Sequence, residues 1–449
     1  MNRELTVGKP ESVLWRFCLP LLGSVLFQQM YNIADSLIAG RFAGVDALAA
    51  VGNSYEITLI YLAFAFGCNM GCSVIVSQLF GAKNYRDMRT AIFTTFIFSG
   101  ILCALLMISG FMFSDTLLHL IRTPENIFID SKKYLDIYTL GIIFLFFYNI
   151  CTGIFSAFGD SKTPFIFLAC SSVANVIADI IFVKLLNMGV AGVAWATFIC
   201  QGISCILSMI VVKKRISAFC IEKNYESKTT FFSFKILKKI LKIALPSTFQ
   251  QGCISIGNIL IQGKINFFGS DATAGYAAAI KLNNMIITMF TALGNGMSNF
   301  AAQNIGAGKK ERIGEGLKAG LKMAFIVCVI VVSVYMIFTR DFVRLFMDED
   351  GTKALSIGVS FLRIVVPFYF VISVKLACDG VLRGIGAMKQ FMTATFTDLI
   401  LRVILAYTLS GIWGTVGIWL AWPIGWIVGT VLSVIFYRSL LRRINYVNN

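Results

Sequence analysis

Twelve apolar stretches, each of about 20 residues or more, dominate this sequence and restrict what the chain can fold into. A helix needs about 20 apolar residues to cross the hydrocarbon core of a bilayer. In lipid, an isolated segment has to satisfy its backbone hydrogen bonds internally, which a helix does. We therefore predict an all-α integral membrane protein with twelve transmembrane helices, near residues 13–39, 53–78, 91–113, 134–158, 164–186, 190–212, 240–266, 274–302, 317–339, 354–382, 391–410 and 414–437.

Composition and charge agree with a membrane location. Hydrophobic residues make up 57% of the 449-residue chain and charged residues only 14%, against roughly 25% charged residues in soluble domains. If the N-terminus is cytoplasmic, the inner segments hold about three times as many Lys and Arg residues as the outer loops. The net charge of +16 is then a topology signal. We expect a multi-pass protein of the cytoplasmic membrane with both termini inside, and no nucleic-acid partner.

The residue types that most enzyme chemistry requires are scarce. The chain contains a single histidine, His119, and its 12 cysteines have irregular spacings without a CxxC pair. Gly308-Lys309 lacks the spacing of a phosphate-binding P-loop, because position 303 is Gln. We therefore expect a protein that is not an enzyme and that has no cofactor.

The second half of the sequence repeats the first at an offset of 222–227 residues. Leu19-Pro20 recurs as Leu245-Pro246, and Gly189 and Gly192 recur as Gly414 and Gly417. The repeat predicts two pseudo-symmetric six-helix lobes, residues 1–222 and 223–449. Because six is even, both lobes enter the membrane from the same side. Transporters built from such parallel repeats bind substrate between the lobes and rock one lobe against the other.

At these repeated positions the chain resembles the multidrug and toxic compound extrusion (MATE) family. The resemblance covers almost the whole chain. It rests on LP near the start of the first and seventh segments, NIADSLIAG, SQLFGAKNY with QNIGAGKKE, GIFSAFGDSKTP with GVLRGIGAMKQ, NVIADIIFV and GVAGVAWAT. It implies a twelve-helix antiporter that expels cationic amphipathic compounds in exchange for Na+ or H+.

Carboxylates held inside a bilayer are costly and usually functional. Asp35 and Asp179 lie in the outer parts of the first and fifth segments, with Asn175 one turn before Asp179 on the same face. Thr197 in the sixth segment lies at a similar depth. Their oxygens suit Na+ or a proton. We predict that Asp35, Asn175, Asp179 and Thr197 couple ion exchange to transport, and the resemblance implies the same three helices. A hydrogen-bonded cluster that only fixes helix packing is the alternative.

The second lobe lacks an equivalent site. Asp35 corresponds to Asn258, and the position of Asp179 corresponds to the apolar Ile404. We therefore expect the N-terminal lobe alone to carry coupling. This departs from the family branch that uses an acid in the seventh segment, where this chain has Gln250 and Gln251.

Other intramembrane polar residues admit two interpretations. Gln28, Gln250, Gln251 and Asp379 are candidates for lining a substrate cavity. Lys375 and Asp379 are four residues apart, as are Asp398 and Arg402, so each pair is also expected to form an ion pair on one helix face.

Local sequence also suggests a hinge and two sites of close packing. Pro20 removes a backbone hydrogen bond early in the first segment and permits bending. We expect ion binding at Asp35 to change that bend. The pairs Gly67/Gly71 and Gly425/Gly429 have the spacing that lets helices approach closely.

Two transport functions remain open at this stage. A monomeric exporter of cationic amphipathic small molecules, driven by Na+ or H+, is favoured. A lipid-linked oligosaccharide flippase of related helix plan is the alternative, but intramembrane cations do not outnumber the acids as an anionic lipid would require. An integral-membrane enzyme is the least favoured, because the sequence shows no catalytic constellation.

Overall fold

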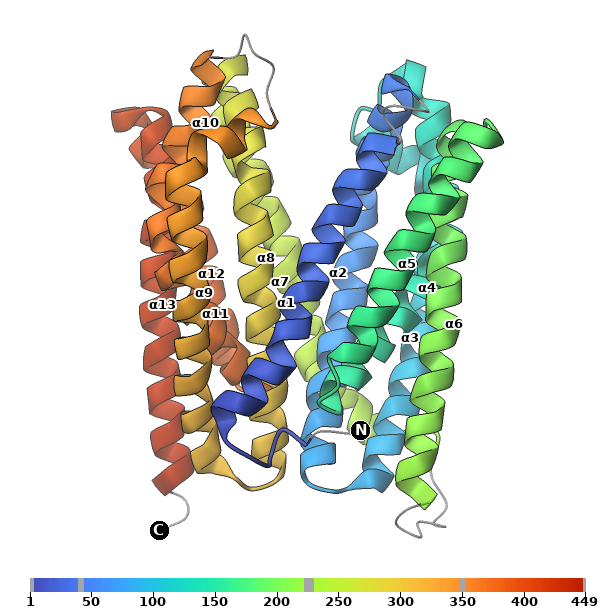
Figure 1. Ribbon diagram of the computed structural model, residues 1–449, viewed down its shortest axis with the longest axis vertical. Coiled ribbons are helices and arrows are strands. Elements are labelled where there is room, and N and C mark those ends of the chain that lie inside the picture. The colour runs from blue at the N-terminus through green and yellow to red at the C-terminus, as the bar shows by residue number, and fades with distance from the viewer. Residues whose placement is uncertain (1–3, 39–43, 222–229, 347–351, 447–449) are drawn as a thin grey trace. The chain divides into compact units, whose positions relative to one another are not determined.

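The computed structural model describes residues 4–38, 44–221, 230–346 and 352–446 and is almost entirely helical. Figure 1 shows long helices that run beside one another within each half of the chain. The first half contains α1 (Pro10–Ile38), α2 (Val45–Gly81), α3 (Tyr85–Leu120), α4 (Glu125–Ala157), α5 (Lys162–Asp179), the short π-helix η2 (Ile180–Leu185) and α6 (Gly189–Ile221).

The second half contains α7 (Phe234–Asn266), α8 (Ser270–Gly306), α9 (Lys310–Arg344), α10 (Thr352–Val365), the 3-10 turn η3 (Val366–Phe368), α11 (Tyr369–Gly384), α12 (Met388–Trp413) and α13 (Thr415–Tyr446). The predicted span 354–382 is thus formed by α10, η3 and α11 together. The other eleven predicted spans each fall on one long helix, except that the fifth continues from α5 into η2. The all-α membrane architecture is confirmed.

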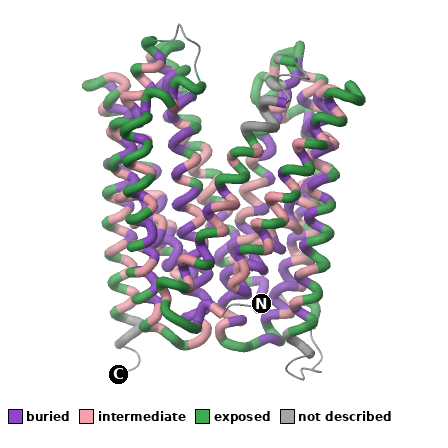
Figure 2. The backbone as a smooth tube through the Cα atoms, viewed as in Figure 1, coloured by how far each residue is buried: buried purple, intermediate pink, exposed green. Residues whose placement is uncertain are grey.

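Eleven helices in the described part of the chain are long and apolar enough to cross a membrane. The twelfth, α7, is less apolar because it carries four lysines in its first third and Gln250, Gln251, Asn258 and Gln262 further along. Figure 2 shows buried and exposed residues alternating along the helices, as expected where one face packs within a unit. Ile97, Ile101, Leu105 and Ile108 are exposed at three- and four-residue intervals along α3. Such an aliphatic stripe suits contact with lipid.

The tight turns confirm that the two halves repeat each other. Gly44 and Gly269 directly precede α2 and α8, with φ of 99° and 94°. Gly189, the first residue of α6, and Gly414, directly before α13, have φ of 56° and 57°. Side chains rarely adopt these positive values, so glycine recurs there for a backbone reason.

Two compact units account for the packing, and neither is one contiguous half of the sequence. One unit comprises Met1–Glu4 and Gly23–Thr248, and the other comprises Leu5–Leu22 and Phe249–Asn449. The predicted boundary between residues 222 and 223 falls in 222–229, outside the described residues, and stays a prediction. What the structure adds is that each unit contains the first part of the other's first helix. We call the point where a helix passes from one unit to the other its crossover. It comes two residues after Pro20 in α1 and two residues after Pro246 in α7.

Repeated glycines receive these exchanged segments. A Cβ at Gly71 of α2 would lie 2.8 Å from the carbonyl oxygen of Ile240 in α7. At the corresponding Gly296 of α8, a Cβ would lie 2.6 Å from Sγ of Cys18 in α1. Both glycines therefore permit a helix to approach more closely than any other residue would. The prediction of close packing at Gly67/Gly71 is confirmed, because Gly67 also lies against Ala244 and Thr248 of α7.

Candidate functional site

The end of α5 carries two buried polar residues on one face. Asn175 and Asp179 are one turn apart, with 3% and 0% of their surfaces exposed. Val173 and Ile177, on the opposite face of α5, are both more than half exposed. The helix therefore turns its polar side into the unit and its aliphatic side outward, as expected for a membrane helix with a functional polar face.

The backbone changes its winding directly after Asp179. Residues Ile180–Leu185 form the π-helix η2, in which Leu186 N donates to the Ile181 oxygen five residues back at 3.0 Å. Single π-helical turns inside α-helices are frequent at functional sites. A Cβ at Gly192 of α6 would lie 3.1–3.2 Å from atoms of Phe182, so this glycine makes room for the wider turn. No pattern in the sequence indicates this feature.

Helix α6 completes the surroundings of Asn175 and Asp179. Cys200 is buried and lies close enough for both side chains to act on its thiol electrostatically. Thr197 is half-buried three residues earlier on α6, on the same side of the helix. The structure thus brings Asn175 and Asp179 close to Cys200, and Thr197 lies one turn before Cys200 on α6. Cys200 was missed because an isolated cysteine in an apolar segment resembles an ordinary core residue.

Asp35 lies in α1, but its side chain is outside the described residues. The backbone still fixes its level relative to α5. Phe27 and Phe165 meet edge to face with ring centroids 5.7 Å apart, and four reversals of the chain make α1 and α5 parallel. Asp35 lies eight residues beyond Phe27 and Asn175 ten beyond Phe165. At 1.5 Å per residue, the two positions differ by only about 3 Å along the helices.

The four residues predicted to line a substrate cavity have different environments. Gln28 in α1 is exposed, and Gln250 and Gln251 in α7 are half-buried. Asp379 in α11 is only 2% exposed. Its Oδ2 accepts from Nζ of Lys375 at 2.9 Å, and its Oδ1 accepts from the hydroxyl of Ser433 at 2.5 Å. Of the two interpretations of Asp379, the structure therefore shows the ion pair.

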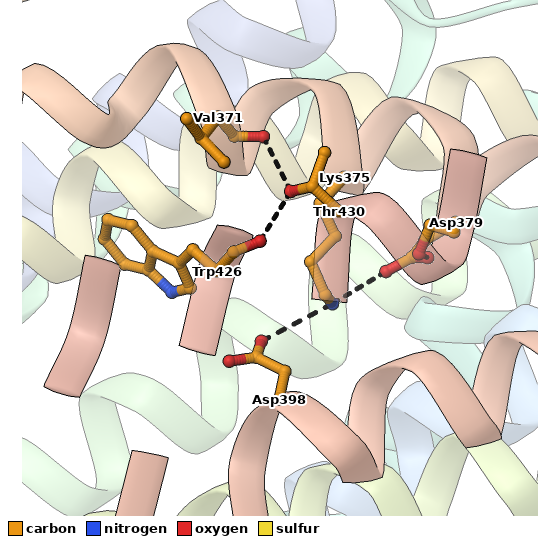
Figure 3. Close-up of polar contacts among 7 residues, drawn as sticks. Val371, Lys375, Asp379, Asp398, Trp426 and Thr430 are labelled. Carbon is orange, nitrogen blue, oxygen red and sulfur yellow. Dashed lines mark hydrogen bonds and ion pairs between the residues drawn. The ribbon is translucent and has the colours of Figure 1, made fainter. Parts of the chain in front are cut away.

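Nζ of Lys375 also lies 3.7 Å from Oδ2 of Asp398 on α12. Figure 3 shows the lysine between the two carboxylates. The expected Asp398–Arg402 ion pair is wrong, because Lys375 is the cation within ion-pair distance of Asp398 among the described residues. The guanidinium of Arg402 lies instead over the ring of Trp422, 4.3 Å from its centroid. Helical spacing places Asp398 and Arg402 on one face, but the packing of α11 against α12 supplies a competing cation. We call Lys375, Asp379 and Asp398 the α11–α12 charge cluster.

The glycine pair on α13 serves this cluster. A Cβ at Gly425 would lie 2.7 Å from Oδ1 of Asp398, and one at Gly429 would lie 2.7 Å from Cε of Lys375. The two glycines make room for charged side chains in addition to bringing helix backbones together. The nearby Thr430 hydroxyl donates to the carbonyl oxygens of Trp426 and Val371, which ties α13 to α11 (Figure 3).

Comparison with known proteins identifies the family. The family model described as MatE matches residues 20–181 and again residues 246–408, one copy for each half of the repeat. The chain belongs to the MatE, or MATE, family. Members of the MATE family are transporters, not enzymes, so this protein is a multi-pass membrane transporter.

Relatives of this MATE protein share most of its length. The probable multidrug resistance protein YpnP of Bacillus subtilis is 30% identical over 437 residues, covering 97% of this chain and 96% of its own. The FAD transporter of Shewanella oneidensis is 22% identical, covering 92% and 91%. The outward-facing structure of a multidrug resistance MATE family transporter of the MOP superfamily has 22% identity and a TM-score of 0.87 over 99% of both chains. That structural likeness supports the MATE fold.

Proposed function

We propose that this MATE protein is a secondary active antiporter that exports cationic amphipathic small molecules in exchange for Na+ or H+. The observation that carries the proposal is the buried Asn175–Asp179 pair on α5, whose opposite face is apolar and exposed. A carboxylate inside a membrane helix costs free energy, and it is usually retained because it exchanges an ion or proton. Multidrug relatives such as YpnP support export as the direction of transport.

The exchanged ion would be held by Asp35, Asn175, Asp179 and Thr197. Carboxylate, amide and hydroxyl oxygens are the ligands that hard cations prefer, and the same carboxylates bind protons. The matching levels of Asp35 on α1 and Asn175 on α5 support a shared site. Na+ or H+ is transported cargo in this scheme, and the protein has no cofactor.

Transport would proceed by rocking of the two units about a substrate cavity to which Gln28, Gln250 and Gln251 contribute. Ion binding at Asp35 would change the bend of α1 at Pro20. The course of α1 supports this proposal. Two residues after Pro20, the helix leaves one compact unit and enters the other. A bend at that point changes how the two parts of one helix are oriented.

We further propose that the transporter is a monomer in the cytoplasmic membrane, with both termini inside. The excess of Lys and Arg in the assigned inner segments supports this orientation. Labelling of single cysteines introduced near each terminus, in intact and in opened cells, measures it directly. Labelling of either terminus in intact cells would contradict the topology.

Dye export from proteoliposomes tests the function. The full-length protein is reconstituted, and efflux of a fluorescent cationic dye is measured under an imposed Na+ gradient and, separately, an imposed H+ gradient. We expect one gradient to accelerate efflux, and Asp35→Asn and Asp179→Asn each to abolish that acceleration. Asp115→Asn is the matched control, because Asp115 is exposed and pairs with Lys132 at the surface of its unit.

Two results would overturn the proposal in different ways. Normal gradient-driven efflux by both Asp35→Asn and Asp179→Asn would remove the coupling site. If no gradient drives dye flux but the protein takes up FAD or flips a lipid-linked oligosaccharide, that compound is the substrate and cationic amphipathic molecules are not.

A further inference from the structure

The α11–α12 charge cluster lies inside the second compact unit, whereas Asn175 and Asp179 of α5 lie in the first. Lys375, Asp379 and Asp398 are 3%, 2% and 5% exposed. Buried charges of this kind do not gain stability over apolar packing unless they are fully paired and hydrogen-bonded. A carboxylate of the cluster that lacks hydrogen-bond partners is therefore a candidate for a role beyond supporting the fold.

The two carboxylates differ in this respect. Both oxygens of Asp379 are occupied, one by the Lys375 ammonium at 2.9 Å and one by the Ser433 hydroxyl at 2.5 Å. Within the described part of the chain, Asp398 has one ion pair, at 3.7 Å through Oδ2. Its Oδ1 is buried and accepts no hydrogen bond from the described residues. An ionised carboxylate is stabilised by each hydrogen bond that it accepts, so Asp398 is the less fully satisfied carboxylate of the cluster.

Two further cations, Arg402 and Arg383, lie beside the cluster. Arg402 lies one turn after Asp398, stacked on Trp422, and Arg383 lies one turn after Asp379, donating to Asn295 of α8 at 3.0 Å. With Lys375, Arg383 and Arg402 against Asp379 and Asp398, the ionised group carries one net positive charge, and a proton on Asp398 raises it to two. Other titratable side chains that reach these residues or their helices are Cys378 on α11, Tyr437 on α13, Tyr276 on α8 and Cys328 on α9.

The glycines of α13 let both charged side chains pack against this helix. A Cβ at Gly429 would lie 2.7 Å from Cε of Lys375, and one at Gly425 would lie 2.7 Å from Oδ1 of Asp398. The lysine ammonium is a single charge on a flexible four-carbon chain. It already lies between two carboxylates at unequal distances, so a small rotation exchanges its closer partner.

We propose that Asp398 is a second proton-binding site of this transporter and that Lys375 controls it. When Lys375 stays on Asp379, a proton binds Asp398 and replaces the 3.7 Å ion pair. When Lys375 moves toward Asp398, the ammonium displaces that proton, which leaves as H+. The role in transport rests on the proposed export function, but the binding of a proton does not. Asp398 would give the second unit a proton-binding site, although the sequence predicted that the N-terminal lobe alone carries coupling.

Infrared titration of the purified full-length protein in lipid nanodiscs tests proton binding directly. A protonated carboxylic acid has a carbonyl stretch that the carboxylate lacks. As the pH is lowered, we expect a component of this band that is present in the wild type and missing in Asp398→Asn. Asp115→Asn, the exposed control, keeps the component. Lys375→Met removes the ammonium that competes with the proton, so the component should be larger at a given pH.

Asp398→Glu provides a second test in case Asp398→Asn does not fold, because it retains a carboxyl group. If Asp398→Asn does not yield folded protein, a shift in the position of the component in Asp398→Glu supports the assignment. An identical band in the wild type and in Asp398→Asn overturns it, as does an unshifted band in Asp398→Glu.

Transport stoichiometry separates this inference from the proposed function. The substrate and proton gradients at which net flux reverses give the number of protons exchanged per substrate. If the wild type exports dye and Asp398→Asn lowers that number by one, the second site takes part in coupling. An unchanged ratio in Asp398→Asn overturns its role in coupling and leaves the export function intact. If the wild type shows no gradient-driven export, the infrared titration still decides whether Asp398 binds a proton.

Discussion

Nη1 of Arg215, near the end of α6, lies 2.5 Å from Oδ2 of Asp160 in the turn between α4 and α5. Asp160 also holds the start of α5, because its Oδ1 accepts from the backbone N–H groups of Lys162 and Thr163, each at 3.1 Å. Oδ2 accepts in addition from the Thr163 hydroxyl at 2.6 Å. One carboxylate thus links the beginning of α5 to the end of α6.

Removal of this carboxylate should destabilise the first unit. We expect Asp160→Ala to lower the free energy of unfolding by about 1–3 kcal/mol, because loss of a helix cap and of charge-assisted hydrogen bonds each cost on this order. Asp160→Asn keeps an oxygen for the N–H groups of Lys162 and Thr163 and should lose less. Thermal unfolding in detergent measures both variants. Equal losses in the two would mean that the charge of Asp160 contributes everything and the cap nothing.

The same carboxylate predicts how stability depends on pH. Burial alone would raise the pKa of Asp160, but hydrogen bonds from Thr163 and the charge of Arg215 outweigh it and hold the pKa below its usual 3.8. A lowered pKa in the folded state means that the stabilisation is complete above about pH 4. It is lost as the pH falls through the lowered value. The melting temperatures of the wild type and Asp160→Asn should therefore converge in acid, and a constant difference would contradict this account.

Gly380 of α11 packs directly against the backbone of α8. A Cβ at this position would overlap the carbonyl oxygen of Gly294. We expect Gly380→Ala to destabilise the second unit by about 1–3 kcal/mol through overpacking. Gly263→Ala in α7 is the control, because a Cβ there meets nothing within 4 Å and alanine favours a helix by about 0.5–1 kcal/mol. Opposite shifts in melting temperature are expected, and a stable Gly380→Ala would show that the two helices separate easily.

Pro20→Ala restores a backbone hydrogen bond donor in α1 and favours a straight helix. If bending of α1 accompanies transport, the rate of dye efflux should fall roughly tenfold, which corresponds to about 1.4 kcal/mol in the activation barrier. Folding should be retained, which gel filtration and thermal unfolding check. Pro246→Ala in α7 is the matched variant, because it alters the other crossover without touching the helix that carries Asp35. Full efflux activity in Pro20→Ala would remove the proposed hinge.

Much of the fold could be predicted because a membrane helix is recognisable from the apolar length of its own segment. Apolar length located the twelve spans, and fixed-offset matches such as Gly189 with Gly414 revealed the repeat. Helix α7 shows the limit of hydropathy alone, since its glutamines, asparagine and lysines make it less apolar than the others. Its span, 240–266, was nevertheless predicted from apolar length, and the match of Leu245-Pro246 with Leu19-Pro20 agrees with that assignment.

The site was predicted only as far as one helix at a time. The spacing of Asn175 and Asp179 put both on one face of α5, and both are buried there. Contacts between helices were out of reach, because spacing says nothing about which neighbour packs alongside. For this reason the Lys375–Asp398 pair, the contribution of Cys200 and the assignment of Leu5–Leu22 to the second unit appear only in three dimensions.

The reciprocal exchange of helix segments after Pro20 and Pro246 has a consequence for the ancestry of this protein. A six-helix ancestor, translated from a single unduplicated gene, would have lacked the segment that completes its own core. Two copies would have had to form a dimer in which each supplied this segment to the other. Gene fusion would then have joined an obligate pair, and halves expressed today as separate polypeptides should regain function only when both are made in one cell.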